Sequence, residues 1–562
     1  MSSMTQDPRK PFSPKKRFRL IGGRVSSLTA WGASTFALLL FSGCGDNVSL
    51  RNPFADPQAK TKPAQPTPTA QQKPTPRQRT ASASNEQRAR QSMMRTSSVR
   101  SGGGGFGSSS VADRPNLSQM VDRLKTEIDS SVDFAPTLVI WMVDSTQSAS
   151  DLRRDLAAAV KGLYGEFQTK GFPSGDKSAD ILKTAIVAFG EKPEFVLETP
   201  TEDYAQVIEK FGSLPSDGSG KENTFAALQQ VIDKYSGEGR ETLIILATDE
   251  AGDDANQVDA TIAKATAAGV RIHAIGIPAP FGLERAPGST SESRQDGMPV
   301  LVQGPETRSP QLLKMKFTSG GFGAEELDSG YGPFGLNYLT RATSGSYLIP
   351  RDVSSGGWPG NAPRFDEKVM QRYPPQYISQ QEYQQLLASN KAAQALHLVS
   401  QRAEIEAMVY PATQFIVAEE ARLKNDLDNA QRTAARLGPL VDSVYTPLDE
   451  AEKDRDNLSD RRMQAAFDLA LGRAAAAKGR VDGYNQMLAI LKGGRKFENP
   501  DNDTWYLEPA NTLEEAGSRL EKVREQAEAA LKRVIEQHPG TPWAQLAEKE
   551  LETPIGWKWV EN

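Results

Sequence analysis

Residues 136–148, with the sequence PTLVIWMVDSTQS, constrain the fold more than any other stretch of this 562-residue chain. Six apolar residues run without a break from Leu138 to Val143 and stop at an aspartate, Asp144. A run this short that is apolar on both faces is typical of a central parallel strand, because helices cover both sides of such a sheet. The stretch therefore predicts a layered α/β fold.

Polar side chains alternate directly after this strand, at Asp144, Thr146 and Ser148. In an open α/β sheet, ligands bind at the carboxyl ends of the strands. Carboxylate and hydroxyl oxygens, with no thiol or imidazole nearby, suit a hard cation such as Mg²⁺ or Mn²⁺. The alternative is that the hydroxyls only cap the helix expected from about Asp151.

Strand and helix patterns largely alternate through the region around this loop, as a parallel doubly wound sheet requires. The expected strands are 184–189, 194–198, 242–248 and 270–277, and the expected helices are 116–130, 152–167, 203–212, 223–235 and 258–268. The buried strand at 242–248 ends in a second aspartate, Asp249. Oxygen ligands therefore gather at two strand ends, which strengthens the metal hypothesis.

These features together resemble a von Willebrand factor type A domain over about residues 116–350, including the closing segment 339–347. The resemblance implies a metal-ion-dependent adhesion site. Its octahedral Mg²⁺ takes hydroxyl oxygens directly and carboxylates largely through water, and leaves one position for a carboxylate of a protein partner. By resemblance, the first- and last-loop roles fall to four residues: Asp144, Thr146, Ser148 and Asp249.

The chain departs from the family pattern in two loops of this site. Thr146 stands where serine is usual, so the hydroxyl is kept. The middle-loop threonine of the family lies six residues before the leucine of an Ala-Leu pair, here Ala227-Leu228, and counting back reaches Glu222. Either Glu222 replaces that threonine, or Thr224 supplies the hydroxyl from a shifted loop. With Glu222 in place, the extra charge raises cation affinity but fills the position of a partner's carboxylate.

Gly, Ser and Pro are abundant in residues 278–333, which we interpret as an insertion in this domain with a hairpin at 299–303 and 311–317. A long loop near the ligand edge of a sheet is often a recognition loop. A tolerated insertion without a role is the alternative.

The first 100 residues hold seventeen Lys and Arg residues against four acidic ones, while the whole chain has a net charge of −5. A basic leader precedes an apolar stretch at 28–41 that is too short to span a membrane and remain there. Residues 1–43 resemble a bacterial lipoprotein signal, which implies acylation of Cys44, the single cysteine of the chain. An ordinary secretory peptide is the alternative.

Residues 44–115, rich in Pro, Gln, Ser and Gly, are expected to form a disordered tether.

Composition changes to Gln, Ala, Glu, Leu, Arg and Lys after residue 374, so 351–377 is interpreted as a linker and 378–551 as a helical bundle or coiled coil. Helices are expected at 378–412, with a break at Pro411, and at 412–438, 446–493 and 512–536. Residues 527–551 resemble a tetratricopeptide-like helical pair, although a plain bundle is the simpler interpretation. The tail, 552–562, carries Trp557 and Trp559, which are expected to dock onto the bundle or onto a partner.

Composition also limits the function. The part of the chain after residue 100 carries a charge of −18, which argues against nucleic acid as its partner. One cysteine and three separated histidines form no thiolate or imidazole metal cluster, and no nucleophile is paired with a base, so no enzyme is expected.

Two hypotheses about the function follow. The first is a lipid-anchored, extracytoplasmic protein of the bacterial cell envelope that recognises a protein partner with metal assistance. The second is an assembly scaffold that self-associates through residues 378–551, with a degenerate metal site.

Overall fold

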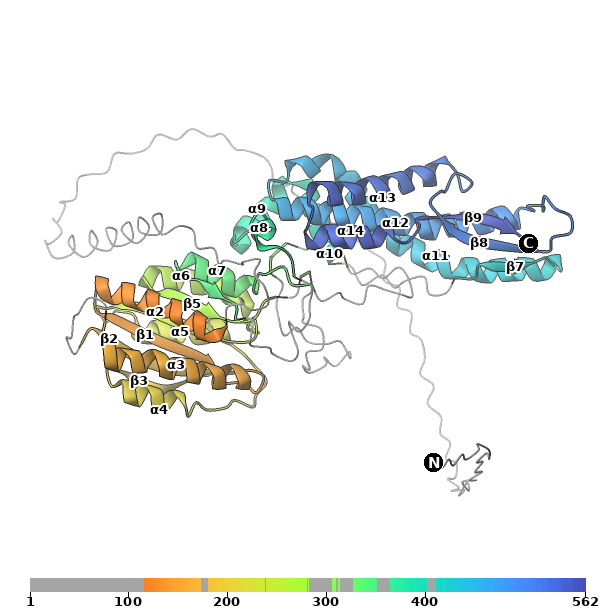
Figure 1. Cartoon of the computed structure of the whole chain (residues 1–562). Coiled ribbons are helices and arrows are strands. Elements are labelled where there is room, and N and C mark those ends of the chain that lie inside the picture. Colours follow the sequence, from red (N-terminus) through yellow and green to blue (C-terminus); the bar gives the residue numbers. More distant parts are fainter. Residues whose placement is uncertain are drawn as a thin grey trace, which may run out of the picture. The chain divides into compact units, whose positions relative to one another are not determined.

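A computed structural model describes residues 116–172, 180–237, 239–279, 281–282, 306–309, 312–313, 327–350, 364–401, 411–417 and 419–562. It confirms the predicted α/β sheet followed by a helix-rich region (Figure 1). The signal, Cys44 and the tether lie outside the described residues, as does the predicted hairpin except for residues 312 and 313. Within the described ranges, no helix has the length and apolar character needed to cross a membrane.

The sheet has six strands in the order β3-β2-β1-β4-β5-β6. Its parallel strands are β1 (Thr137–Asp144), β2 (Leu182–Phe189), β4 (Glu241–Ala247), β5 (Arg271–Ile275) and β6 (Tyr347–Leu348). The edge strand β3 (Pro193–Thr201) pairs antiparallel with β2. The order of the strands reverses beside β1, which lies between β2 and β4. Ligands of doubly wound sheets bind at such a point, outside the carboxyl ends of the strands.

Helices cover both faces of the sheet, which explains why β1 is apolar on both sides. Val139, Trp141 and Val143 pack on one face, against α2 (Leu117–Phe134), α3 (Ser150–Lys170) and α4 (Tyr204–Phe211). Leu138, Ile140 and Met142 pack on the other, against α5 (Thr224–Tyr235), α6 (Val258–Ala268) and α7 (Phe334–Ala342). The 3₁₀ turn η2 (Ala255–Gln257) precedes α6.

One buried polar chain crosses the first of these layers. The indole N–H of Trp141 donates to the Tyr164 hydroxyl at 2.9 Å, and this hydroxyl lies 2.9 Å from the hydroxyl of Thr184. All three side chains are inaccessible to solvent. Because no water reaches them, each hydrogen bond has to be made within the protein.

We expect Tyr164→Phe to destabilise the protein by about 1–3 kcal/mol, since it leaves the Trp141 N–H buried without its acceptor. Urea unfolding followed by circular dichroism measures this loss. Tyr204→Phe is the matched control, because the ring of Tyr204 lies 5.5 Å from that of Tyr164 and is only partly buried. Equal losses in the two variants would contradict the importance of the hydrogen bond.

The helix-rich region is built around α12, which is buried along most of its length. Its elements are α8 (Glu367–Met370), α9 (Gln380–Ser389), α10 (Lys391–Ser400), α11 (Glu420–Ala451), η3 (Glu452–Asn457), α12 (Arg461–Lys492), α13 (Ser518–Gln537) and α14 (Pro542–Leu551). A helix enclosed on all sides has no polar face, in agreement with the mixed pattern of α12. A Cβ atom on Gly472 would lie 2.7 Å from the Leu531 side chain, so this glycine lets α13 approach closely.

The predicted helix boundaries in this region were wrong at two places. Residues 414–416 form a strand, and α11 then continues from Glu420 to Ala451 through Pro439 and Pro447, where the sequence was read as a break. The predicted single helix at 446–493 is in fact the end of α11, the turn η3 and α12. Packing of the apolar stripe of α11 outweighs the local cost of the two prolines.

A three-stranded antiparallel sheet, which the sequence analysis missed, lies beside α12. Its strands are β7 (Gln414–Ile416), β8 (Thr504–Ala510) and β9 (Gly556–Glu561), in the order β7-β8-β9. The indole N–H groups of Trp557 and Trp559 donate to the carbonyls of Arg480 and Met487 on α12, at 2.8 and 3.2 Å. The tail was expected to dock either onto the bundle or onto a partner, and in the structure it lies on the bundle.

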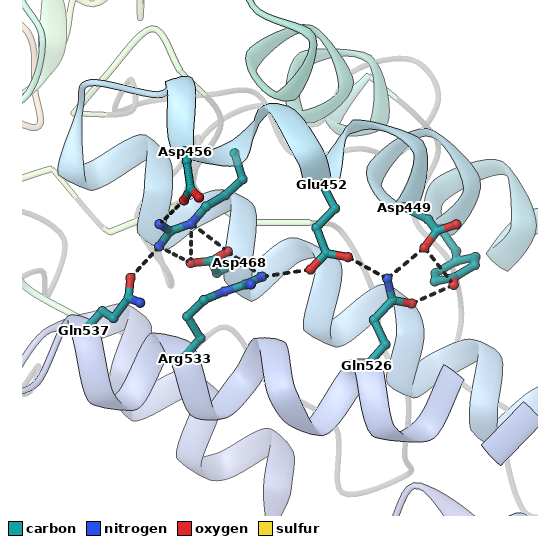
Figure 2. A network of polar contacts seen from close by, with 9 residues as sticks. Asp449, Glu452, Asp456, Asp468, Gln526, Arg533 and Gln537 are labelled. Atoms are coloured by element: carbon teal, nitrogen blue, oxygen red, sulfur yellow. Dashed lines mark hydrogen bonds and ion pairs between the residues drawn. The ribbon is translucent and has the colours of Figure 1, made fainter. Parts of the chain in front are cut away.

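A polar network joins η3, α12 and α13 (Figure 2). Asp468, which is fully buried on α12, accepts hydrogen bonds from Arg455 and pairs with Arg533 at 3.0 Å. Arg533 also pairs with Glu452, and Gln526 donates to Glu452 at 2.9 Å. Because the buried carboxylate has two guanidinium partners, its charge is compensated.

Candidate metal centre

Three carboxylates converge at the carboxyl edge of the six-stranded sheet. Asp144 is the last residue of β1, Asp249 follows the neighbouring strand β4 by two residues, and Glu222 lies in the loop before α5. Each offers an oxygen, and the three oxygens lie within 4.8 Å of one another. The side chains are 0%, 1% and 3% exposed, respectively. β1 and β4 pair in parallel with Val143 opposite Ala247, so the sheet register itself brings the two aspartates together.

Hydroxyl groups surround Asp144. Its Oδ1 accepts from the backbone N–H of Thr146 at 2.8 Å and from the Thr146 hydroxyl at 2.6 Å, while Oδ2 accepts from the Thr248 hydroxyl at 2.7 Å. Ser148 Oγ lies 3.0 Å from Thr146 Oγ1 and donates to Asp249 Oδ1 at 3.4 Å. A hydroxyl that donates its hydrogen still has lone pairs, so Thr146 and Ser148 keep oxygen ligands available for a cation.

The middle loop places Glu222 within the carboxylate cluster. Thr224 begins α5, and its hydroxyl lies beside Gly252, where an added Cβ would be 2.9 Å from Oγ1. Among the described residues, Glu222 Oε2 and Thr224 Oγ1 are buried oxygens without a hydrogen-bond partner. Both candidates for the middle-loop ligand therefore have an unsatisfied oxygen, but the convergent carboxylate is that of Glu222.

Backbone hydrogen bonds hold the first loop in place. Ser145 N–H donates to the Phe189 carbonyl at 2.7 Å, which ties the end of β1 to the end of β2. The Arg153 guanidinium, from the first turns of α3, donates to the backbone carbonyls of Asp144, at 3.0 Å, and Thr146. The carboxylate and the hydroxyls are therefore presented on a fixed backbone.

Burial and mutual repulsion raise the pKa values of the acidic groups at this edge. Desolvation, followed by repulsion from Asp249, raises the pKa of Asp144 to about 7. Desolvation, with Asp144 as the strongest repelling neighbour, raises the pKa of Glu222 far above its usual range. The adjacent Glu250 is partly buried, and desolvation and Asp249 raise its pKa to about 9. A cluster in this state favours either protons or a cation.

The oxygen-only donor set fits Mg²⁺ or Mn²⁺, and the unsatisfied oxygens of Glu222 and Thr224 point to the same conclusion. Asp144, Glu222 and Asp249, with the hydroxyls of Thr146 and Ser148, would hold such an ion. A bound divalent cation would supply positive charge that compensates the buried carboxylates and cross-links the three loops.

Sequence reasoning named the converging residues but not those that support them. Thr248, Asp253 and Asp254 act through contacts with loops distant in sequence. Arg153 acts through backbone carbonyls of the first loop. The Asp254 carboxylate, for example, accepts from the backbone N–H groups of Phe225 and Ala226 at 3.1 and 2.7 Å and so caps α5. A cap supplied from another loop leaves no pattern in the sequence next to the helix that it caps. The acidic pair Asp253-Asp254 itself was visible in the sequence.

Comparison with protein families supports this geometry. Residues 139–299 match the model of the von Willebrand factor type A domain. The chain contains a type A domain. This confirms the resemblance stated above for the domain itself, and its sheet carries the converging carboxylates on the loops that the resemblance indicated.

A search of the curated proteins found no sequence match. Solved structures with weak similarity include BatB from Bacteroides thetaiotaomicron, with 14% identity over 39% of this chain and 92% of that chain and a TM-score of 0.24. The von Willebrand domain of the type V pili tip protein Mfa5 from Porphyromonas gingivalis has 18% identity over 21% and 39%, with a TM-score of 0.18. Proximal thread matrix protein 1 from the mussel byssus, with a zinc-occupied site, has 16% identity over 26% and 36%, with a TM-score of 0.21. Similarities this low say nothing about what the chain binds.

Proposed function

We propose that this chain is a protein-binding component of the bacterial cell envelope, whose type A domain uses a divalent cation to organise the recognition surface at the carboxyl edge of its sheet. The observation that carries the proposal is the convergence of three buried carboxylates, from three separate loops, within 4.8 Å. Without a cation, these carboxylates remain ionised only at a high cost in free energy. With a cation, they become a cross-link between the loops.

The cell-envelope location rests on the leader, whose basic and apolar segments precede Cys44. Two or three acyl chains on that cysteine would anchor the protein stably, because each buried CH₂ contributes about 0.8 kcal/mol. The Pro-rich segment at 44–115 would then separate the folded part from the membrane.

The metal proposal is tested by titrating Mg²⁺ and Mn²⁺ calorimetrically into the full chain and into Asp144→Ala. We expect binding in the parent protein and none in the variant, since Asp144 is one of the three converging carboxylates and is fully buried. At a metal concentration 100 times the dissociation constant, the cation should stabilise the parent by about 2.7 kcal/mol.

Asp233→Ala is the matched control, because Asp233 is an exposed carboxylate of α5 that pairs with Lys264 on the surface. It should bind the cations as the parent does. Absence of both heat and thermal stabilisation in the parent would refute the metal proposal. Self-association that persists in Asp144→Ala would assign the function to the helix-rich region instead.

A further inference from the structure

Glu222 differs from the other acidic residues of the site because it comes from the loop before a helix and not from a strand end. Building on the cation site proposed above, we infer that Glu222 completes the coordination of the cation from within the chain. No carboxylate of a partner then reaches the ion, and the partner contacts the outer surface of the loops.

The position of Glu222 is the first argument. Its side chain is 3% exposed, and its Oε2 is buried without a hydrogen-bond partner in the described structure. A carboxylate so placed is strongly destabilising unless a proton or a cation compensates its charge. Its other neighbours in the cluster, Asp144 and Asp249, are acidic, so a cation bound between the three groups accounts for the arrangement.

The backbone on both sides of Glu222 is the second argument. Its N–H donates to the Asp253 carboxylate at 3.0 Å, and its carbonyl accepts from the Asp253 N–H at 2.8 Å. The next N–H, of Asn223, donates to the Gly190 carbonyl at 3.0 Å. Gly220, with φ of +68°, provides the turn that leads into this clamped segment. The loop therefore fixes the carboxylate inward and gives it little freedom to move aside for another ligand.

The charge of the site is the third argument. Three ionised carboxylates exceed the charge of a divalent cation, and Glu250 lies beside them, partly buried. A fourth carboxylate brought by a partner would enter a region that is already negative, where repulsion disfavours it. The exposed residues on the outer side of these loops, Glu191, Lys221 and Asp253, remain available for contact.

The experiment uses Mn²⁺ bound to the full chain and counts the exchangeable water molecules on the ion by water-proton relaxation. The parent is compared with Glu222→Thr and Glu222→Gln, with and without acetate as a carboxylate probe. We expect acetate to leave the parent unchanged. Glu222→Thr should gain one water, which acetate then displaces, and should bind Mn²⁺ at least tenfold more weakly. Asp233→Asn, an exposed change on α5 away from these loops, should behave as the parent.

One further measurement, and the pattern of negative results, distinguish this inference from the cation site on which it rests. In EDTA at neutral pH, Glu222→Gln should melt at a higher temperature than the parent, because the parent has to take up a proton to bury the Glu222 carboxyl whereas the amide is already neutral. This measurement also verifies that the variant folds. Equal water counts in the parent and both Glu222 variants, or displacement of water by acetate in the parent, would overturn the inference while leaving the cation site intact. Failure of every form to bind Mn²⁺ would overturn the proposed function as well.

Discussion

Glu550→Ala is expected to cost about 3–5 kcal/mol of unfolding free energy, because it removes the carboxylate shared by two buried arginines. Glu550 lies near the end of α14 and is 2% exposed. It accepts from Arg473 Nε at 3.3 Å and from Arg480 Nη1. Both arginines belong to α12, the enclosed helix, so their charges stay in the interior when the carboxylate is lost.

Arg480 adds to this effect because it also holds the end of α14. Its guanidinium donates to the carbonyls of Glu550, Thr553 and Pro554, at 3.2, 2.8 and 3.1 Å. Thr553 and Pro554 follow the helix, so their carbonyls have no partner within it, and the guanidinium acts as a cap. Loss of Glu550 therefore disturbs the contact between α12 and α14 at the point where the chain turns toward β9.

Urea unfolding followed by tryptophan fluorescence measures the loss, since Trp543, Trp557 and Trp559 lie in the same part of the structure. Glu548→Ala is the matched control: it removes an exposed carboxylate two residues earlier in the same helix and should change the free energy by less than about 0.5 kcal/mol. A similar, small change in both variants would show that the buried pairs contribute little.

The α/β part of the fold was predictable because each signal was local and strong. The apolar run of β1 and the similar run of β4 fixed two neighbouring parallel strands. Parallel strands end at the same edge, so the positions of Asp144 and Asp249 followed from the strand assignment alone. The predicted helices of this part differ from the observed ones by at most a few residues, and at α6 (Val258–Ala268) the bounds coincide.

The helix-rich region was less predictable because prolines were given more weight than periodicity. Buried residues at 427, 434, 441 and 448 recur every seven residues in α11, and this pattern passes Pro439 without interruption. Such a repeat indicates one continuous helix. The strands β7, β8 and β9 come from three distant segments, and no local pattern in any of them predicted their pairing.

The ligand of the middle loop could not be assigned from the spacing of residues alone. The spacing before Ala227-Leu228 pointed to Glu222, but it left Thr224 as an equal alternative. The structure adds the contacts between Glu222 and Asp253, which depend on how two loops meet in space. Sequence spacing cannot give these contacts, because residue 253 follows a different strand.

In the absence of metal, the protein should become less stable as the pH rises from 6.5 to 8.5. The folded-state pKa values of Asp144 and Glu250, about 7 and about 9, lie above their ordinary values, and that of Glu222 is raised as well. The folded chain therefore holds protons that the unfolded chain has already released above about pH 5. Each increase in pH then favours the unfolded state, and we expect the melting temperature in EDTA to fall by about 5 °C over this range.

Restricting the range to pH 6.5 and above separates this effect from the buried histidines. Burial lowers the pKa of His273 to about 3 and that of His538 to about 4, so both are neutral in the folded protein. In the unfolded state they titrate near pH 6.5, and stability due to them rises with pH only up to about that value. Above pH 6.5, the carboxylates determine how the stability changes with pH.

With saturating Mg²⁺, the dependence of stability on pH should reverse. The cation binds the ionised carboxylates, so protons compete with it, and its stabilising effect grows as the pH rises. The difference in melting temperature between Mg²⁺ and EDTA should therefore be larger at pH 8.5 than at pH 6.5. Glu222→Gln should flatten the EDTA curve, because one of the raised carboxyl groups no longer titrates. A metal-free curve that rises with pH, or a Mg²⁺ effect that is largest at pH 6.5, would mean that these carboxylates do not form the cation site.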